Sequence, residues 1–355
     1  NLFTYSAAVS ACARARRWQG ALQLFDEMQR ERGLVPDLVL YGAVVGACAS
    51  GEQWALAVGL LGEMQGAALA PNAVAYNAAI TACGRGRQWE ASWGLLEEMR
   101  CAAIAPTMVT FGAMISACER AGLWERAVSL MADASQCRVA LDVVSWSSAI
   151  SACEKGHAWE RALDILEGLE REPGVRADVV ACNAAISACA KGHRWHTALE
   201  LMEEMRERRL APDLISYNAA VKACERGEAW EHALSLFAGM RHHGCAPDLI
   251  TCSVLTTACA SGRRWQMAVD LLKEMKESGF PRSVSLLTTV IQACEACGTM
   301  SSASPAAVTP RSATGAPPQR KAEGQDQQVK LLLDELRFVG LEHLQGEDDE
   351  DDGLR

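Results

Sequence analysis

The sequence predicts an all-α fold, a right-handed α-α superhelical solenoid of helix-turn-helix repeats, from three periodic features. A tryptophan and a cysteine each recur every 35 or 36 residues, and proline marks the same place in several of these intervals. A sustained period in this range is typical of repeat arrays, in which each unit buries its apolar face against its neighbours. The tryptophan column is Trp18, Trp54, Trp89, Trp124, Trp159, Trp195, Trp230 and Trp265, and the cysteine column is Cys12, Cys48, Cys83, Cys118, Cys153, Cys189, Cys224, Cys259 and Cys294.

This period divides residues 1–300 into eight full repeats and a partial ninth. Two repeats have one extra residue, near "RERGLVP" and "REPGVRA", where a loop accepts an insertion. We number the repeats from the N-terminus as 2–37, 38–72, 73–107, 108–142, 143–178, 179–213, 214–248 and 249–283, with the partial ninth at 284–300.

Each repeat is expected to hold two helices. In repeat 3 the first helix should span roughly 75–84 and the second 88–100. The second helix of repeat 2 carries an apolar stripe with helical spacing, made by Trp54, Ala57, Val58, Leu61 and Met64. Proline occupies the turn between repeats, where its missing amide proton is not needed, at Pro36, Pro71, Pro106, Pro212 and Pro247.

Bulk composition excludes several classes of protein. Half of the residues are hydrophobic, so a large core is possible, and the net charge of −10 argues against non-specific binding to nucleic acid by excess positive charge. No run of 18 apolar residues occurs, so no membrane span or membrane partner is expected. The chain begins at Asn1 within a helical pattern, so we interpret it as a fragment or a processed form whose targeting peptide lies upstream.

The cysteine column is interpreted as core packing. Thiols one repeat apart on packed helices are about 10 Å from each other, which is too far for a disulfide or a tetrahedral zinc site. The one C-x-x-C, Cys294 to Cys297, lacks a second pair. The tryptophan column is interpreted as core as well, and no metal ion or other cofactor is expected.

The first helix of each repeat has a second face that the core does not need. At 100° per residue, its second, fifth and thirteenth residues point away from the apolar face. The second residues are apolar: Phe3, Val39, Val74, Val109, Val144, Val180, Ile215 and Ile250. The fifth residues are small or polar: Ser6, Gly42, Asn77, Gly112, Ser147, Asn183, Asn218 and Ser253. The thirteenth are basic in six repeats: Arg14, Arg85, Arg120, Lys155, Lys191 and Arg226.

These three columns predict a ribbon that suits single-stranded nucleic acid. An apolar group, a small hydrogen-bonding group and a cation fit the flat faces of bases, their edges and the phosphates. The alternative is an ordinary solvated helix face. Acids such as Glu97, Glu98, Glu203 and Glu204 gather on the other helix, so the cations are segregated.

A fourth column is the last residue of each repeat. Its members are Asp37, Asn72, Thr107, Asp142, Asp178, Asp213, Asp248 and Ser283. Such residues often cap the following helix. However, the hydroxyls three places into the next repeat look like nearer caps, which leaves the last residue for another role; they belong to Thr4, Thr110, Ser145, Ser216 and Thr251.

The sequence resembles the pentatricopeptide repeat family, specifically its P-type members. The resemblance rests on the 35-residue period, "ISYNAAVKAC" in the first helix, "ALxLxxEM" in the second and "APD" at the turn, and it covers residues 2–300. The tetratricopeptide pattern, with its period of 34 and its different tryptophan arrangement, fits less well. The regular tryptophan departs from the commoner family pattern and is interpreted as a packing variant.

The resemblance implies binding of single-stranded RNA, one base per repeat, with the N-terminus toward the RNA 5′ end. Second residues would sandwich bases, fifth and last residues would read base edges, and thirteenth cations would meet phosphates. In the family code, Asn with Asp favours U, Ser or Thr with Asp favours G, and Asn with Thr or Ser favours a pyrimidine. The implied target is 5′-G-A-(C/U)-G-G-U-U-N-3′, in which the two glycine repeats lean weakly to A and G and Ser253/Ser283 is unassigned.

The resemblance also implies a role in an organelle, plastid or mitochondrion, in RNA processing, stabilisation, editing or translation. No deaminase-type domain with His-x-Glu and Cys-x-x-Cys ligands occurs, so catalysis is not expected, and DNA is not an expected partner. Two alternatives stay open: a protein–protein scaffold that uses the same groove, and a specificity subunit for a catalytic domain outside this chain.

Beyond residue 300 the composition changes. Residues 301–327 are rich in Ser, Pro and Ala and predict a disordered linker. Residues 328–345 predict an amphipathic helix, which could cap the truncated ninth repeat or recruit a protein partner, and 346–355 form an acidic tail. This tail could also fold back on the basic column.

Overall fold

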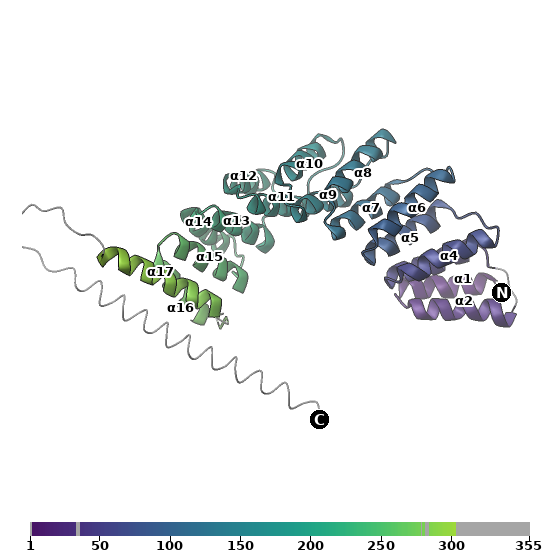
Figure 1. The fold of residues 1–355 in the computed structure, drawn as a ribbon, viewed down its shortest axis with the longest axis horizontal. Helices are drawn as coiled ribbons and strands as arrows, with labels where there is room; N and C mark the ends of the chain where they lie inside the picture. The colour runs from purple at the N-terminus through teal and green to yellow at the C-terminus, as the bar shows by residue number, and fades with distance from the viewer. Residues whose placement is uncertain (1, 33–35, 278, 281–283, 303–355) are drawn as a thin grey trace, which may run out of the picture. The chain divides into compact units, whose positions relative to one another are not determined.

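The computed structural model describes residues 2–32, 36–277, 279–280 and 284–302, and across these residues every regular element is one of seventeen α-helices (Figure 1). The first helices of the repeats are α1 (Leu2–Arg14), α3 (Leu38–Ser50), α5 (Ala73–Arg85), α7 (Met108–Ala121), α9 (Val143–Lys155), α11 (Val179–Lys191), α13 (Leu214–Arg226), α15 (Leu249–Ser261) and α17 (Val284–Ser302). The second helices are α2 (Trp18–Arg32), α4 (Trp54–Gly66), α6 (Trp89–Cys101), α8 (Trp124–Gln136), α10 (Trp159–Arg171), α12 (Trp195–Glu207), α14 (Trp230–His242) and α16 (Trp265–Glu277).

Packing between neighbouring helices confirms the predicted solenoid. The chain forms two compact parts, Asn1–Ala188 and Cys189 onward, which we describe separately. In the first part α1, α3, α5, α7 and α9 pack in succession, and α4 packs on both α3 and α5. In the second part α13, α15 and α17 pack in succession, and α14 packs on α13 and α15. The predicted right-handed superhelix stays a prediction.

The predicted helices of repeat 3 fall within one or two residues of α5 and α6. The helix of the partial ninth repeat, α17, runs through Ser302 and so extends into the segment predicted as linker. The predicted amphipathic helix at 328–345 and the acidic tail at 346–355 lie outside the described residues. None of the helices in the described part of the chain is long and apolar enough to cross a membrane.

The last residue of repeats 1 to 7 caps the next helix, so the prediction that the third residue is the cap is only partly right. The cap side chain accepts a hydrogen bond from the backbone N–H three residues on, at 2.8–3.5 Å. The capping residues are Asp37, Asn72, Thr107, Asp142, Asp178, Asp213 and Asp248. Thr110, Ser216 and Thr251 lie in the first turn and complete a capping box by accepting a hydrogen bond from the backbone N–H of the last residue, and Thr4 and Ser145 lie in the first turn as well. The reason is that the helix begins directly after the inter-repeat turn, where the last residue is still extended.

The cysteine column lies in the core, as predicted, except for Cys12 in the first repeat, which is half-buried. Burial raises the pKa of six of its thiols to about 11, and that of the Cys224 thiol to about 12. The cysteines in the described residues form no disulfide. Thiols with such pKa values are protonated at neutral pH and act as small apolar packing groups.

The tryptophan column lies between repeats rather than inside the core, so that prediction was only partly right. The column is half-buried, and Trp54 is 36% exposed. Five of the rings approach the glycine that follows the first helix of the next repeat so closely that a Cβ there would lie 2.1–2.6 Å from the indole Cδ1. The pairs are Trp18–Gly51, Trp54–Gly86, Trp124–Gly156, Trp195–Gly227 and Trp230–Gly262.

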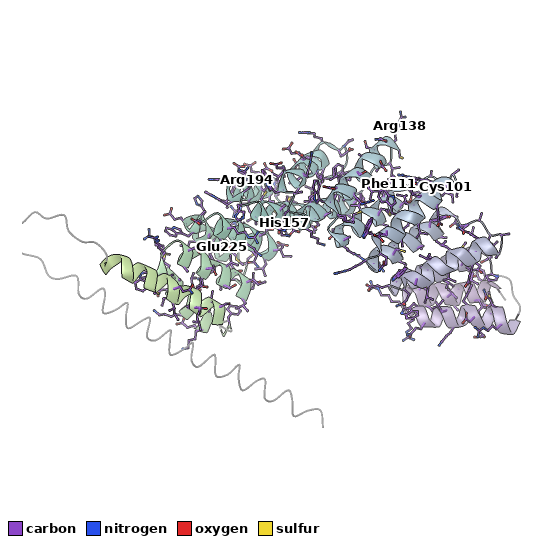
Figure 2. All side chains as sticks on the ribbon, viewed as in Figure 1. Cys101, Phe111, Arg138, His157, Arg194 and Glu225 are labelled. Atoms are coloured by element: carbon purple, nitrogen blue, oxygen red, sulfur yellow. The ribbon has the colours of Figure 1, made fainter. Side chains whose placement is uncertain are left out.

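Glycine occurs at these positions because the indole leaves no room for a Cβ, and not because the backbone requires a positive φ. Gly156 has φ of −84°, whereas the following residue, His157, takes the left-handed conformation with φ of 59°. The His157 side chain is labelled in Figure 2. Gly227 and Glu228 repeat this arrangement, with φ of −91° and 56°. At these positions glycine is therefore needed because the indole of the preceding repeat leaves no room for a Cβ.

Candidate nucleic-acid interface

The second residues of repeats 1 to 8 form an exposed apolar row. Their exposed fractions lie between 55% for Val109 and 81% for Phe3, and the other members are Val39, Val74, Val144, Val180, Ile215 and Ile250. Isolated apolar residues on a surface are ordinary, but a row repeated on successive helices marks a binding surface. The row ends at Ile250, because the ninth repeat carries exposed Ser285 at the equivalent position.

The fifth residue of a repeat lies beside the last residue of the same repeat. The Asn218 amide Nδ2 donates to the Asp248 carboxylate at 3.3 and 3.2 Å. The Asn77 Nδ2 donates to the Thr107 Oγ1 at 3.3 Å. The Ser147 Oγ lies 3.3 Å from the Asp178 Oδ1, and its proton is shared with the nearer Val143 carbonyl at 2.8 Å. The sequence-predicted pairs therefore come together in these repeats, although they lie 30 or 31 residues apart.

Other members of the fifth column differ in their surroundings. Ser147 and Asn183 are nearly buried, and Ser253 donates to the carbonyl of Ile250 in its own helix. Asn183 and Asp213 lie in the two separately described parts, Ser6 lies within α1, and Ser283 lies outside the described residues. The space around Gly42 is open, whereas a Cβ on Gly112 would lie 2.9 Å from the Ser145 Oγ.

A last-residue carboxylate is held as an acceptor. Burial raises the pKa of Asp248, but donation from the Thr251 backbone and hydroxyl and from Asn218 more than offsets this, so the pKa lies below its ordinary value. Asp248 therefore stays ionised at neutral pH. Its carboxylate is a hydrogen-bond acceptor held in place beside the Asn218 amide, which donates to it.

Three of the six predicted phosphate ligands make contacts within the protein that can be described in detail. The Arg85 Nη1 donates to the Ala49 carbonyl at 3.1 Å, and the Arg226 Nη1 donates to the Ala190 carbonyl at 3.3 Å. Both carbonyls lie in the last turn of the preceding first helix, where positive charge is favourable. Lys155 pairs with Glu119 at 2.9 Å. Arg14 and Arg120 are exposed, and Lys191 ends α11.

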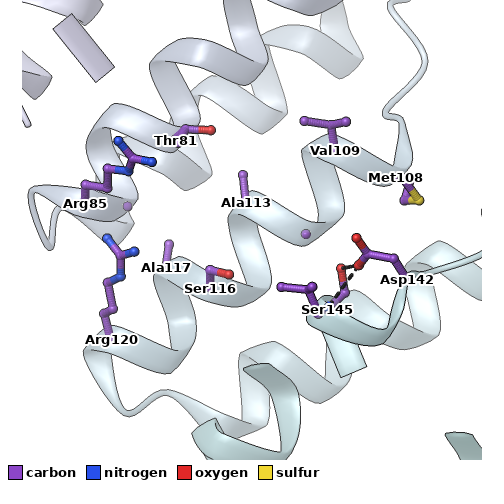
Figure 3. Close-up of a pocket in the computed structure, with 13 residues that line it drawn as sticks. Thr81, Arg85, Met108, Val109, Ala113, Ser116, Ala117, Arg120, Asp142 and Ser145 are labelled. Carbon is purple, nitrogen blue, oxygen red and sulfur yellow. Dashed lines mark hydrogen bonds between the residues drawn. The ribbon is translucent and has the colours of Figure 1, made fainter. Parts of the chain in front are cut away.

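One pocket brings all four columns together in the first part of the chain. A cavity of about 320 Å³ opens between α5, α7 and α9. In Figure 3, Arg85 and Arg120 lie at one end and Asp142 and Ser145 at the other, with Val109 on the rim. Gly112 and Val144 complete the set. The second, fifth, thirteenth and last residues therefore share a surface in repeat 4, as the helical wheel predicts.

Sequence reasoning missed one group of residues at this surface. The Thr110 Oγ1 donates to the Asn77 Oδ1 at 2.6 Å, and the Thr251 Oγ1 donates to the Asn218 Oδ1 at 2.5 Å. These third residues of the next repeat were interpreted as caps. The signal that could have found them is the pairing of Asn at one fifth position with Thr at the next third position.

Nothing in the described residues indicates a metal site, because no group of three or more His, Cys, Asp or Glu side chains there could hold an ion. The helix pairs and their stacking define an α-α repeat solenoid with one chemically distinct face on the first helices. Models described as PPR repeat family match residues 71–120, 177–226 and 212–261, and a model described as PPR repeat matches 3–32, 109–137 and 250–280. Together they cover more than half of the sequence, and the chain belongs to the pentatricopeptide repeat family.

Solved structures similar to the chain are also pentatricopeptide repeat proteins. PPR10 in complex with an 18-nucleotide psaJ RNA element is 20% identical with a TM-score of 0.46, and the match covers 85% of this chain and 55% of that one. PPR10 from maize is 17% identical with a TM-score of 0.39, over 96% and 60% of the two chains. The PPR domain of Arabidopsis thaliana protein-only RNase P 1, in complex with tRNA, is 15% identical with a TM-score of 0.46, over 51% and 95%.

The chain thus spans little more than half the length of PPR10. Among curated proteins, no sequence matches it.

Proposed function

We propose that the chain binds single-stranded RNA along the face formed by its first helices, with one base at each repeat. The observation that carries this proposal is the pairing of fifth and last residues, as in Asn218 and Asp248, between exposed apolar second residues. Bases would insert between successive second residues, such as Ile215 and Ile250, and present an edge to the pair.

The pairs set the proposed target through the family code. Ser6/Asp37 and Ser147/Asp178 correspond to G, Asn77/Thr107 to a pyrimidine, and Asn183/Asp213 and Asn218/Asp248 to U. Gly42/Asn72 and Gly112/Asp142 offer one side chain each and lean to A and G. With the N-terminus toward the RNA 5′ end, the target reads 5′-G-A-(C/U)-G-G-U-U-N-3′.

The test is fluorescence anisotropy with labelled 5′-GACGGUUA-3′ RNA and the full chain. The controls are the same RNA with C at the sixth and seventh bases, and the same RNA as a duplex. Tight binding to the first RNA, lost with both controls, supports the proposal and its register. Equal binding to all three retains RNA but contradicts the base assignments, and no binding at low salt contradicts RNA binding.

A scaffold for protein partners is the second candidate, and the internal partners of Arg85, Lys155 and Arg226 favour it. Salt dependence separates the two. Six phosphate contacts predict a slope of roughly −4 for log affinity against log salt, and three predict roughly −2. The steeper slope requires these cations to exchange their internal partners for phosphates, whereas a scaffold shows no RNA affinity to lose.

The biological setting is part of the same proposal. We place the protein in a plastid or mitochondrion, where it would act by occupying a transcript in processing, stabilisation, editing or translation. A protein partner at the predicted helix 328–345 would supply any catalytic step.

A further inference from the structure

The orientation of the Asn218 amide is fixed from two sides. Its Nδ2 donates to both oxygens of Asp248, and its Oδ1 lies 2.5 Å from the Thr251 Oγ1, whose single proton is shared between this amide oxygen and the Asp248 Oδ1 at 2.8 Å. The reversed amide would place a carbonyl oxygen against a carboxylate, which is repulsive, and would remove the hydrogen bond that Oδ1 accepts from the hydroxyl. Asp248 and Thr251 together therefore allow one orientation, with the NH₂ group beside the carboxylate.

Repeat 3 has the same arrangement with a hydroxyl in place of the carboxylate. The Thr110 Oγ1 donates to the Asn77 Oδ1 at 2.6 Å, and the Asn77 Nδ2 donates to the Thr107 Oγ1 at 3.3 Å. Thr107 can donate as well as accept, so it does not select the amide orientation alone. The Thr110 Oγ1 already accepts a hydrogen bond from the Thr107 backbone N–H at 2.9 Å, and its own proton is directed at the Asn77 Oδ1.

The sequence couples these positions throughout the chain. Each of the three fifth-position asparagines is followed, in the next repeat, by a hydroxyl at the third position: Asn77 by Thr110, Asn183 by Ser216 and Asn218 by Thr251. The serine readers and Gly42 are followed there by apolar residues: Ser6 by Leu40, Gly42 by Ala75, Ser147 by Ala181 and Ser253 by Leu286. The exception is Gly112, which is followed by Ser145.

The third-position hydroxyls do not themselves reach the surface. Thr110, Ser216 and Thr251 are fully buried, and Ser145 is nearly so. A group in that position can act on a ligand only through the side chain above it. Their capping role does not explain the coupling to asparagine, because Ala181 follows Asp178 at a capped helix start without any hydroxyl.

We propose that the third residue of the following repeat, where it is Thr or Ser, is a positioning residue that orients the reader asparagine so that its NH₂ group faces the base. This inference rests on the proposed RNA-binding function. A base at an asparagine repeat is then specified by three residues from two repeats: the fifth, the last and the next third. In repeat 4 two of these, Asp142 and Ser145, stand at the pocket without an asparagine.

The first experiment changes Thr251 alone. Anisotropy titrations compare RNA with U or C at the seventh base, for the unchanged protein, Thr251→Val and Thr251→Ser. Thr251→Val should reduce the preference for U over C by about 5- to 10-fold, within the range for a well-oriented pair of hydrogen bonds. Thr251→Ser should retain it. Thermal unfolding, followed in parallel, reports any loss of the capping interaction separately.

The second experiment builds the arrangement elsewhere. Ser147→Asn places an asparagine above Ala181, and Ser147→Asn with Ala181→Ser supplies the missing hydroxyl. Gly112→Asn already has a hydroxyl at the next third position, but its Cβ would lie 2.9 Å from the Ser145 Oγ, so this side chain must shift to accommodate it. At the fifth base, the double variant should select U over C several-fold better than the single variant. At the fourth base, Gly112→Asn should select U in one step.

The outcomes separate this inference from the function on which it rests. If the unchanged protein discriminates U from C but Thr251→Val does so equally well, or if Ser147→Asn matches the double variant, the positioning role is overturned and RNA binding stands. If the unchanged protein binds no RNA, both proposals fail.

Discussion

In repeats 7 and 4 the last residue caps the following helix in the same way, but the fifth residue is Asn218 in one and Gly112 in the other. In repeat 7, the Asp248 carboxylate accepts hydrogen bonds from the Thr251 backbone N–H at 2.8 Å and from the Asn218 Nδ2 at 3.2 Å. In repeat 4, Asp142 accepts from the backbone and the hydroxyl of Ser145 at 2.9 and 2.6 Å, and the place of the amide is part of a cavity (Figure 3).

This comparison shows that the capping framework forms with or without a reader side chain. The helix start is therefore a local property of the last and third residues, whereas base selection depends on what the fifth residue adds. Because the two functions use the same carboxylate, the fold and the proposed RNA site are coupled through one residue per repeat.

The two repeats also end their first helices differently, and this difference predicts the largest effect on stability. The Trp195 ring lies against Gly227, whose φ is −91°, whereas α7 runs one residue longer and ends at Gly122, whose φ is 71° and which has open space around it. We expect Gly227→Asn to destabilise the fold by about 1–3 kcal/mol, because its Cβ overpacks against the indole. Gly122→Asn should cost less than about 1 kcal/mol, because Asn tolerates the left-handed conformation.

Urea unfolding of both variants measures this difference. If the two substitutions cost the same, the Trp195 ring does not restrict the residue at position 227. Gly62→Asn, in an open position on α4, reports the cost of the side chain itself.

The second prediction separates capping from reading in repeat 7. Asp248→Ala should lose about 0.5–2 kcal/mol of stability with the cap, and also the preference for U at the seventh base. Asp248→Asn should keep a cap, since Asn72 performs that role for α5, but it should lose the preference, because a neutral amide no longer presents a fixed acceptor. Asn218→Ala should affect the preference with little loss of stability.

Unfolding midpoints and U-versus-C titrations on the same preparations test this pattern. A loss of stability in Asn218→Ala as large as that in Asp248→Ala would contradict the division of roles. Asp142→Ala in repeat 4 should show the loss of stability with only a small change in base preference.

How far the sequence predicts this molecule depends on the range of the interaction. The period, the helix pairs and the buried cysteines follow from spacing, because each reports on packing between identical units. The apolar second residues were predicted by the helical wheel, and their exposure agrees. The caps were misplaced by three residues, because Asp, Ser and Thr at both positions satisfy the same local pattern and only the backbone at Asp248 or Asp142 decides between them.

Interactions between side chains of different repeats were beyond sequence reasoning. Nothing in the composition shows that Arg85 donates to the Ala49 carbonyl, or that a tryptophan ring contacts the glycine of the next repeat. Both contacts depend on the offset between neighbouring helices, which a single repeat does not specify. The sequence contains Asn218 and Thr251 at corresponding positions of successive repeats, but only the 2.5 Å distance between Asn218 Oδ1 and Thr251 Oγ1 shows that they interact.

The smallest expected effect compares the two glycine repeats. Gly42 and Gly112 both lie inside helices, where alanine is favoured by about 0.5–1 kcal/mol. A Cβ on Gly42 meets open space, so Gly42→Ala should gain this amount, whereas a Cβ on Gly112 would lie 2.9 Å from the Ser145 Oγ. Gly112→Ala should therefore gain less, unless Ser145 is also changed to Ala. Urea unfolding of Gly42→Ala, Gly112→Ala and Gly112→Ala with Ser145→Ala tests this. An equal gain in stability for Gly42→Ala and Gly112→Ala would show that the Ser145 side chain moves aside at little cost. A hydroxyl that moves at little cost would also fix the orientation of an asparagine amide poorly. This small difference in stability therefore reports how strongly a third-position hydroxyl can contribute to base selection.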